Sequence, residues 1–416
     1  WEVYAMKLDN YGATVRAAVI GYGCRGKMQT DLLLTMPDVE IVSVCDKYED
    51  RAKAAADAVE KARGKRPFHS TNARECMDRD DVDCVFVFSS WETHIEQTIE
   101  ALDCGKRVAM EVGGSQSVEE CWRLVRKSEE TGIPVMMLEN CCYGENELNL
   151  LNMIRKGLFG TIVHCEGAYA HDLRDEVGNG DVNRHYRQYH FLHRNGELYP
   201  THELGPIATY LNLNRGNRMV SLVSMASKAC GLHEWLKENR ADNPALQSAQ
   251  VNEGDIVTTL IKCANGETIL LKHDCTLPRP YSRGGVVRGT KGIWQEDNHG
   301  IYIDGRSPHD PSDWMHHFED DAPYMKEYEH PIWTAYHEIG ERGGHGGMDF
   351  LVLRAFVESV QKNEQPPIDV YDAAAWMAIT PLSEESIARG SIPVAVPDFT
   401  NGKWLLPREN ATGTYA

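Results

Sequence analysis

The segment 195-NGELYPTHELGPIATYLN-212 places two proton-carrying side chains close together. Tyr199 and His202 are three residues apart, at the start of an apolar stretch whose pattern predicts a helix, and Glu203 follows the histidine directly. Proteins can tune the pKa values of a phenol and an imidazole towards neutrality, so the pair could exchange protons with a substrate. Two other interpretations are open: metal ligation, or a helix start with Thr201 as its N-cap.

The histidines around this segment do not form a known metal-binding pattern. They stand at positions 185, 190, 193 and 202, and no HExxH motif is present. The twelve cysteines include no CxxC pair, which is the usual mark of a structural zinc site. We therefore expect this protein to hold no metal ion.

The first third of the chain carries a nucleotide-binding pattern. The apolar run 15-VRAAVI-20 leads directly into Gly21-x-Gly23-x-x-Gly26 and then into a predicted helix. Such a turn lets a pyrophosphate approach the backbone closely, and the helix N-terminus favours its charge. A second apolar run, 41–46, ends in Asp46, which is 20 residues after Gly26 (46 − 26). An acid there suits the ribose hydroxyls of NAD and repels the extra phosphate of NADP, so we expect NAD as the cofactor.

Apolar strands then alternate with amphipathic helices as far as residue 140. The pattern predicts strands at 83–90, 107–112 and 134–140, and helices at 92–105 and 117–132. This alternation is typical of an α/β fold with a doubly wound, parallel, Rossmann-type sheet, in which ligands lie beyond the carboxyl ends of the strands. The rule nominates the residues that follow each strand: Ser89 to His94, Glu111 with Val112, and Glu139 with Asn140.

The pattern changes after a predicted helix at 145–160. Longer strands are predicted at 161–172, 219–227, 255–276 and 285–294, with a hairpin turn at 264–266 and two late helical stretches at 347–363 and 369–390. The polar segment 173–196 is predicted to be a long loop. We expect two domains: an NAD-binding Rossmann domain at 1–142, and at 143–416 a C-terminal α+β domain with a large, mainly antiparallel sheet that serves the substrate and oligomerisation.

Composition narrows the possible partners. A net charge of −19 disfavours nucleic acid and anionic membranes, which both bind basic surfaces, and no apolar run approaches the roughly 20 residues that span a bilayer. Several cysteines lie in apolar, strand-like runs, which indicates buried thiols in a reducing compartment. We expect a cytoplasmic protein that forms a homo-oligomer through its C-terminal sheet. The chain begins with Trp1, so a removed leader is an open alternative.

Several motifs resemble glycoside hydrolase family 109, which lies within the broad glucose–fructose oxidoreductase/inositol dehydrogenase (Gfo/Idh/MocA) family. The matching segments are MLENCCYGE (137–145), GAYAHDLR (167–174), HRNGELYPTHELGP (193–206), RGNRM with SMASKACGLH (215–233), PRPYSR (278–283) and GGHGGMDF (343–350). The broad family usually carries Glu-Lys-Pro where this chain has Glu111, Val112 and Gly113. The missing lysine disfavours a plain sugar dehydrogenase. Family 109 usually reads YPTHGLGP, whereas Glu203 replaces the glycine here.

The resemblance implies two groups of site residues. It implies that NAD is held by the glycine turn and by residues near the strand ends: Gly21, Gly23, Cys24, Arg25, Gly26, Asp46, Trp91, Glu92, Thr93, His94, Glu111, Val112, Asn140 and Tyr199. It implies that a sugar is bound by residues from the second half: Tyr169, Arg187, Tyr199, Pro200, Thr201, His202 and Tyr281. As a hypothesis we assign His202 as a base at the 3-hydroxyl or C2, Tyr143 or Tyr199 as its partner, and Glu111 as an orienting or relay acid.

Family 109 contains NAD-dependent N-acetylgalactosaminidases, so the resemblance implies a small-molecule glycoside, an N-acetylgalactosaminide or a related hexosaminide, as the substrate. The expected reaction oxidises C3 transiently, eliminates the leaving group between C1 and C2, adds water and returns the hydride, so that NAD+ is recycled. This route needs tunable proton carriers rather than paired carboxylates. Two alternatives are an NAD-dependent sugar dehydrogenase acting at C3 of a pyranoside, and a sensor with an inactive site.

Overall fold

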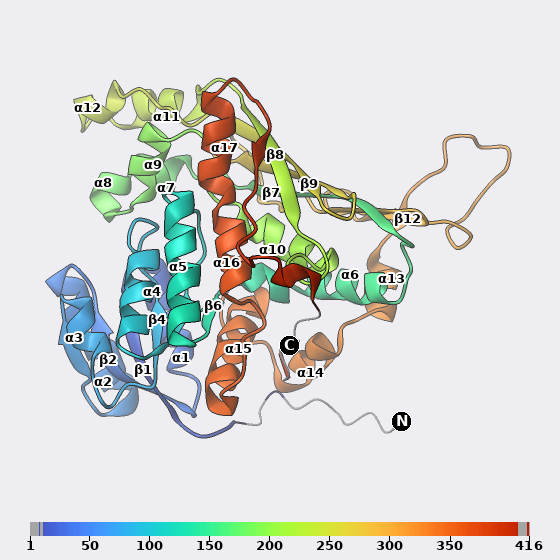
Figure 1. The fold of residues 1–416 in the computed structure, drawn as a ribbon. Helices are drawn as coiled ribbons and strands as arrows, with labels where there is room; N and C mark the ends of the chain where they lie inside the picture. The colour runs from blue at the N-terminus through green and yellow to red at the C-terminus, as the bar shows by residue number, and fades with distance from the viewer. Residues whose placement is uncertain (1–7, 9–10, 407–413, 416) are drawn as a thin grey trace.

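A computed structural model describes residues 8, 11–406 and 414–415, and two β-sheets organise these residues (Figure 1). The nucleotide-binding part, residues 11–138, is called the first half below. It is blue to cyan in Figure 1 and forms one sheet with its helices. The second sheet, which includes β7, β8, β9 and β12, lies beside it, and the helices α15, α16 and α17 lie between the two in the view shown. None of the described helices is both long enough and apolar enough to cross a bilayer.

The described residues of the first half form a sheet of six parallel strands in the order β3-β2-β1-β4-β5-β6. The strands are β1 (Val15–Ile20), β2 (Val39–Cys45), β3 (Phe68–Ser70), β4 (Cys84–Val87), β5 (Arg107–Met110) and β6 (Val135–Met137). The helices are α1 (Cys24–Leu33), α2 (Glu49–Arg63), α3 (Ala73–Met77), α4 (His94–Asp103) and α5 (Val118–Thr131). This arrangement confirms the predicted doubly wound sheet. The strand order reverses between β1 and β4, which places the ligand cleft at their carboxyl ends.

Local sequence explains these elements well. In α2 the side chains of Ala52, Ala55, Ala56 and Val59 are buried, which is the spacing of one helical face, and Gly64 ends the helix in the left-handed conformation. The strands β4, β5 and β6 are buried almost throughout, as expected for a sheet that helices cover on both faces.

The described residues of the second half form a nine-stranded sheet in the order β14-β13-β12-β11-β7-β10-β9-β8-β15. Its strands are β7 (Ile162–Ala170), β8 (Met219–Ala226), β9 (Ile256–Cys263), β10 (Thr268–Asp274), β11 (Val286–Gly289), β12 (Gly292–Gln295), β13 (Gly300–Ile303), β14 (Glu319–Asp320) and β15 (Val394–Ala395). All neighbours are antiparallel except β7 and β10, which confirms a mainly antiparallel sheet. The predicted hairpin between β9 and β10 is present, but 285–294 is a hairpin of two short strands rather than one strand.

The segment 173–196 is not the predicted loop, because it contains three short helices. They are α7 (Arg174–Gly178), α8 (Gly180–Asn183) and α9 (Arg187–His193). Contacts from distant residues hold them: Arg240 donates a hydrogen bond to Asp181 over 2.8 Å, and Trp235 packs so closely on Gly178 that no larger side chain fits there. Tertiary contacts of this kind leave no signal in the local sequence.

The late helices are α15 (Met348–Lys362), α16 (Val370–Met377) and α17 (Ile379–Ala388), so the predicted stretch 369–390 is divided near Ala378. Although they come from the end of the chain, α15 and α16 pack on elements of the first half, namely β1, α1, β6 and α5. Arg354 of α15 forms a buried ion pair with Asp38 over 2.7 Å. The chain therefore returns to close one side of the nucleotide-binding half.

Shorter elements complete the fold. The predicted helix 145–160 is α6 (Glu145–Arg155) and ends five residues early (160 − 155). The segment after β6 forms a 3-10 helix, η1 (Asn140–Tyr143), and α10 (Thr201–Tyr210) packs on β7 and η1. The other elements are α11 (Gly231–Asn239), α12 (Pro244–Gln247), α13 (Ala322–Glu327), α14 (Pro331–Ile339), η2 (His345–Gly347) and η3 (Lys403–Leu405).

Candidate active site

The glycine turn between β1 and α1 has the geometry that a dinucleotide requires. Gly21 has φ +97°, and a Cβ atom on Gly26 would lie 2.2 Å from the carbonyl oxygen of Gly21. The first turn of α1 contains no acidic residue and no side-chain cap, and Cys24 is exposed. The backbone N–H groups of this turn can therefore donate hydrogen bonds to an anion. Asp46 accepts hydrogen bonds from the backbone of Tyr22 and Tyr48, which fixes its carboxylate at the end of β2.

The residues after β4 bury polar atoms that lack partners. Trp91 and His94 are buried, and neither the indole nitrogen nor the two imidazole nitrogens has a hydrogen-bond partner among the described residues. Burial lowers the pKa of His94 to about 4, so the ring is neutral. Glu92 is paired with His190 over 3.1 Å, and Thr93 bonds to Ser89. Buried groups of this kind are normally satisfied by a ligand or by water, so this edge of the cleft fits a polar cofactor such as NAD.

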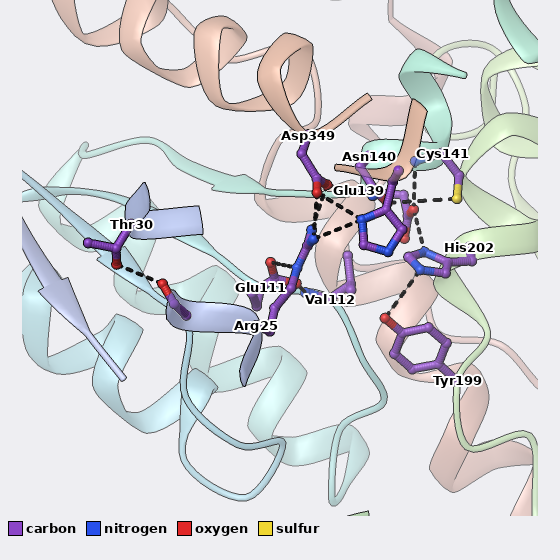
Figure 2. A network of polar contacts seen from close by, with 12 residues as sticks. Arg25, Thr30, Glu111, Val112, Glu139, Asn140, Cys141, Tyr199, His202 and Asp349 are labelled. Atoms are coloured by element: carbon purple, nitrogen blue, oxygen red, sulfur yellow. Dashed lines mark hydrogen bonds and ion pairs between the residues drawn. The ribbon is translucent and has the colours of Figure 1, made fainter. Parts of the chain in front are cut away.

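Arg25 joins the glycine turn to the ends of two other elements (Figure 2). Its guanidinium donates to Glu111 over 2.8 Å and, with two nitrogens, to Asp349 over 2.8 and 2.9 Å. Asp349 also accepts from Asn140 and from the ring of His345, each over 2.8 Å. The structure thus brings together Arg25, Glu111 and Asn140, three of the residues that the resemblance assigned to the NAD site, and Val112 lies beside Glu111 with its backbone bonded to that carboxylate.

Asp349 and His345 were missed by the sequence analysis as site residues. They lie in the segment GGHGGMDF, which was noted only as part of a resemblance. A run of glycines that ends in an acid at the first turn of a helix was the available signal. Burial opposes the charge of Asp349, but the hydrogen bonds from His345 and Arg25 outweigh it and hold the pKa of Asp349 well below its usual value.

A chain of three side chains connects the interior to the predicted reactive pair. Nδ1 of His202 lies 2.7 Å from Oε1 of Glu139, and Nε2 lies 3.3 Å from the hydroxyl of Tyr199. Burial opposes ionisation of Glu139, but the charge and hydrogen bond of His202 outweigh it and lower the pKa of this carboxyl. An ionised carboxylate can only accept, so Nδ1 carries a proton, and in the neutral form of the imidazole Nε2 is then the hydrogen-bond acceptor. Sequence analysis placed Glu139 at a strand end but gave it no role.

An aromatic wall supports Tyr199. Its ring stacks on Trp91 at 5.6 Å between centroids and packs on Tyr169 at 4.5 Å. The guanidinium of Arg187 lies over all three rings, 5.0 Å from the centroid of Tyr199, and is paired with Glu176 over 2.9 Å. Burial raises the pKa of Tyr199 well above its usual value, so its hydroxyl is a neutral donor at physiological pH. The structure therefore places Arg187 and Tyr169 against the predicted reactive pair.

The remaining predicted sugar-site residues lie around this wall. Tyr281 is 48% exposed as a residue and its ring meets His171 edge-on, and the hydroxyl of Tyr169 lies 3.3 Å from the same histidine. Pro200 and Thr201 are buried at the start of α10. Pro200 is the N-cap of this helix and no side chain caps it, so the interpretation of Thr201 as an N-cap is wrong.

Tyr143 is not part of the reactive group. Its hydroxyl donates to the carbonyl of Tyr415 over 2.9 Å, and its own carbonyl accepts from the indole of Trp333. Among the described residues, no hydrogen bond and no ring contact joins Tyr143 to Tyr199 or His202. The chain leaves β6 in a 3-10 turn, which directs Tyr143 towards α14 and the C-terminal residues. We therefore leave Tyr143 out of the proposed machinery.

Glu203 lies behind the reactive pair rather than beside a substrate. Its backbone passes so close to β7 that a Cβ atom on Gly167 would lie 2.6 Å from the Glu203 Cβ. The carboxyls of Glu197, Glu203 and Glu253 are all buried, with His273 3.1 Å from Glu253. Burial raises the pKa of Glu203 well above its usual value and that of Glu197 to about 7. The acid that replaces the expected glycine thus belongs to an internal group of carboxyls.

The metal interpretation can be compared with this geometry. Glu139, Cys141 and His202 each offer a ligand atom, and these atoms lie within 4.8 Å of one another. Glu139 and His202 are 2.7 Å apart, which is a hydrogen-bond distance. Two ligands of one zinc or magnesium ion lie about 3 Å apart or more, given metal–ligand distances of about 2.0 to 2.1 Å. The observed geometry therefore suits a shared proton.

The fold and the dinucleotide cleft define the class of the protein. Residues 15–138 match the family model "Oxidoreductase family, NAD-binding Rossmann fold", so the first half is a domain of this class. A levoglucosan dehydrogenase, solved with NADH and L-sorbose, shares the fold with a TM-score of 0.69 at 17% identity, covering 93% of this chain and 100% of that one.

The second half defines the particular family. Residues 143–406 match the model "Glycosyl hydrolase 109, C-terminal domain". A glycosyl hydrolase family 109 protein of Stenotrophomonas maltophilia is 41% identical, covering 94% of this chain and 90% of the relative. An alpha-N-acetylgalactosaminidase of Tannerella forsythia is 37% identical, covering 94% of this chain and 87% of the relative. The chain belongs to glycosyl hydrolase family 109.

Proposed function

We propose that the protein hydrolyses N-acetylgalactosaminides or related hexosaminides, with NAD+ as a cofactor that is recycled in each turnover. The observation that carries this proposal is the chain from Glu139 through His202 to Tyr199, which lies next to the residues expected to hold NAD. The activity named for the Tannerella forsythia relative supports the choice of sugar.

The proposed chemistry divides between the cofactor and the protein. When bound, NAD+ supplies a reversible acceptor for the hydride of the sugar C3–H bond, and the resulting ketone acidifies the proton on C2. The glycine turn, Asp46, the residues after β4, and Glu111 with Asn140 would hold it. The protein's task is to move protons on and off the sugar without paired glycosidase carboxylates.

His202 is the proposed base. Nδ1 is held by Glu139, so Nε2 accepts a proton from the 3-hydroxyl or from C2 of the sugar. The imidazolium that forms is stabilised by the buried carboxylate of Glu139. Tyr199 is the proposed partner because its hydroxyl shares Nε2 and is neutral, so it can donate to the sugar or to the leaving oxygen.

Arg187 is proposed to orient Tyr199 and the sugar. It is packed over the rings of Trp91, Tyr169 and Tyr199, and its pair with Glu176 leaves other N–H groups available. Its Nε atom is buried and has no partner among the described residues, which suits a hydrogen bond to a substrate oxygen. Glu111 keeps its proposed role as an orienting acid, because it fixes Arg25 at the cleft.

A substitution at His202 tests the proposal. We expect His202→Ala to lose about 10²-fold or more in kcat on 4-nitrophenyl N-acetylgalactosaminide, as expected for removal of a general base. His171→Ala is a matched control, since this histidine contacts Tyr169 but not Glu139 or Tyr199 through any hydrogen bond between described residues. Normal turnover by His202→Ala would contradict the proposal.

The second candidate is an NAD-dependent sugar dehydrogenase acting at C3, which the shared fold supports. It needs the same base but releases reduced cofactor. Continuous NADH accumulation with a pyranoside, at a rate matching product formation, would favour this candidate over the glycosidase.

A further inference from the structure

We propose that Asp349 and His345 are positioning residues that hold Arg25 in a latch across the cofactor cleft and retain NAD between turnovers. This inference rests on the proposed function in so far as it assumes NAD binding, and it goes beyond it by assigning a role to the GGHGGMDF segment. The latch consists of Arg25, Glu111, Asn140, His345 and Asp349, and Figure 2 labels all of these except His345.

The side chain of Arg25 forms a bridge between the glycine turn after β1 and the residue that follows β5. It begins in the first turn of α1, directly after the glycine turn that follows β1, and its guanidinium ends at Glu111, directly after β5. In the strand order, β4 lies between β1 and β5. The side chain therefore crosses the carboxyl end of β4, which is where a doubly wound sheet binds its dinucleotide.

Asp349 is the fixed end of this bridge. It is 2% exposed and accepts two hydrogen bonds from Arg25, one from Asn140 and one from His345. Two hydrogen bonds from one arginine to a buried carboxylate form an interaction that is both strong and geometrically specific. Glu111 and Asp349 accept three bonds from the guanidinium, and the side-chain amide of Gln29 also faces it, so the group is held in one place at the edge of the cleft.

The segment that carries His345 is held against α1. A Cβ atom on Gly343 would lie 2.8 Å from the side chain of Leu32, and one on Gly347 would lie 2.5 Å from Tyr336. The hydroxyl of Tyr336 also accepts from the backbone of Arg342 over 2.7 Å. His345 has φ +53°, a left-handed conformation that is strained for a non-glycine residue and that is found at ligand clamps.

A purely structural role for Asp349 is the competing explanation, and the fold offers a control for it. A second buried pair, Arg354 with Asp38, also ties α15 to the first half, but five residues further along the helix (354 − 349), and Asp38 directly precedes β2, at the opposite end of the strands from the glycine turn. Loss of either pair should destabilise the protein, whereas only loss of the Asp349 pair should open the cofactor cleft.

Release of NADH distinguishes these explanations. The purified protein would be loaded with NADH and diluted into excess NAD+, and the decay of tryptophan-sensitised NADH fluorescence would be followed for the wild type, Asp349→Asn, His345→Ala and Asp38→Asn. We expect Asp349→Asn to speed release about 10-fold or more and His345→Ala about 3-fold, since hydrogen bonds to charged groups are lost. Asp38→Asn should lower the Tm and leave release within about 2-fold of the wild type.

The outcomes separate the latch from the function. Release at the wild-type rate in both Asp349→Asn and His345→Ala would overturn the latch, as would equal acceleration by Asp38→Asn. If Asp349→Asn does not fold, His345→Ala and Arg25→Lys decide the matter by the same readout. Faster release in a protein that cleaves no N-acetylgalactosaminide would keep the latch and reject the proposed function. A glycosidase activity that becomes dependent on added NAD+ only in the latch variants would support both.

Discussion

Oε1 of Glu139 lies 2.7 Å from Nδ1 of His202, and this contact sets the tautomer of the histidine that faces Tyr199. Glu139 comes from the end of β6 in the nucleotide-binding half, whereas His202 comes from the first turn of α10 in the other half. The contact therefore joins the two halves at the point where the proposed chemistry takes place.

Glu139→Gln should reduce kcat about 10²-fold or more. A glutamine fits the same space but does not stabilise the imidazolium, and its amide can hold the wrong tautomer of His202. The measurement is kcat and KM for 4-nitrophenyl N-acetylgalactosaminide, with NAD binding and circular dichroism as checks on the fold. Activity within about 3-fold of the wild type would show that Glu139 does not orient the base.

Tyr199→Phe should lower kcat about 10²-fold while KM changes little. The phenyl ring keeps its packing on Trp91 and beneath Arg187, so the variant removes mainly the hydroxyl that bonds Nε2 of His202. Tyr169→Phe is a matched control in the same aromatic wall and should cost less in kcat. Equal losses of kcat in the two variants would show that the hydroxyl of Tyr199 takes no special part in proton transfer.

Glu203→Gln should flatten the dependence of stability on pH. Burial raises the pKa of Glu203 well above its usual value and that of Glu197 to about 7, from an ordinary value of 4.5. A carboxyl whose pKa is higher in the folded protein binds more protons there than in the unfolded chain. The contribution of such a carboxyl to stability is therefore complete below pH 4.5 and is lost as the pH rises through its raised pKa in the folded protein, which for Glu197 is about 7.

Thermal unfolding at pH 5 and pH 8 measures this effect. The fall in Tm between the two pH values should be smaller in Glu203→Gln than in the wild type, by roughly 2 °C or more. Glu139 and Glu197 face this carboxyl, and Glu253 and His273 face Glu197; all four remain in the variant, so some dependence should persist. An unchanged slope would mean that Glu203 is ionised and compensated in the folded protein.

The outer face of the second sheet is the proposed site of self-association. Leu260 on β9 is 43% exposed and pairs across the sheet with Leu270 and Val223, while Met225 on β8 is 64% exposed. Leu260→Glu should shift the protein to a smaller species in size-exclusion chromatography with light scattering, because a charge at an apolar interface is costly. Val182→Glu, at a more exposed apolar position on α8, should leave the size of the species unchanged. A wild type that is monomeric at all concentrations would contradict the proposal.

The sequence predicted the features that depend on residues close together in the chain. The glycine turn, Asp46 and the buried strands of the first sheet follow from chain geometry and apolar periodicity within a few residues. The same holds for the turn between β9 and β10, where Ala-Asn-Gly closes the hairpin.

Contacts between residues that are far apart in the sequence could not be predicted from such local patterns. Glu139 is 63 residues from His202, and Asp349 is 324 residues from Arg25, so neither partnership has a sequence signal of its own. Tyr143 was assigned to the reactive group as a tunable proton carrier, but the 3-10 turn after β6 directs it elsewhere. The helices within 173–196 depend on Arg240 and Trp235, which come much later in the chain.

Hydrolysis of 4-nitrophenyl N-acetylgalactosaminide in D2O tests the central claim most directly. Proton removal at C2 by a side chain, followed by water addition, should give nitrophenol together with N-acetylgalactosamine that carries deuterium at C2, with no net accumulation of NADH. Release of nitrophenol with a fully protonated C2, or steady growth of NADH without hydrolysis, would contradict the account.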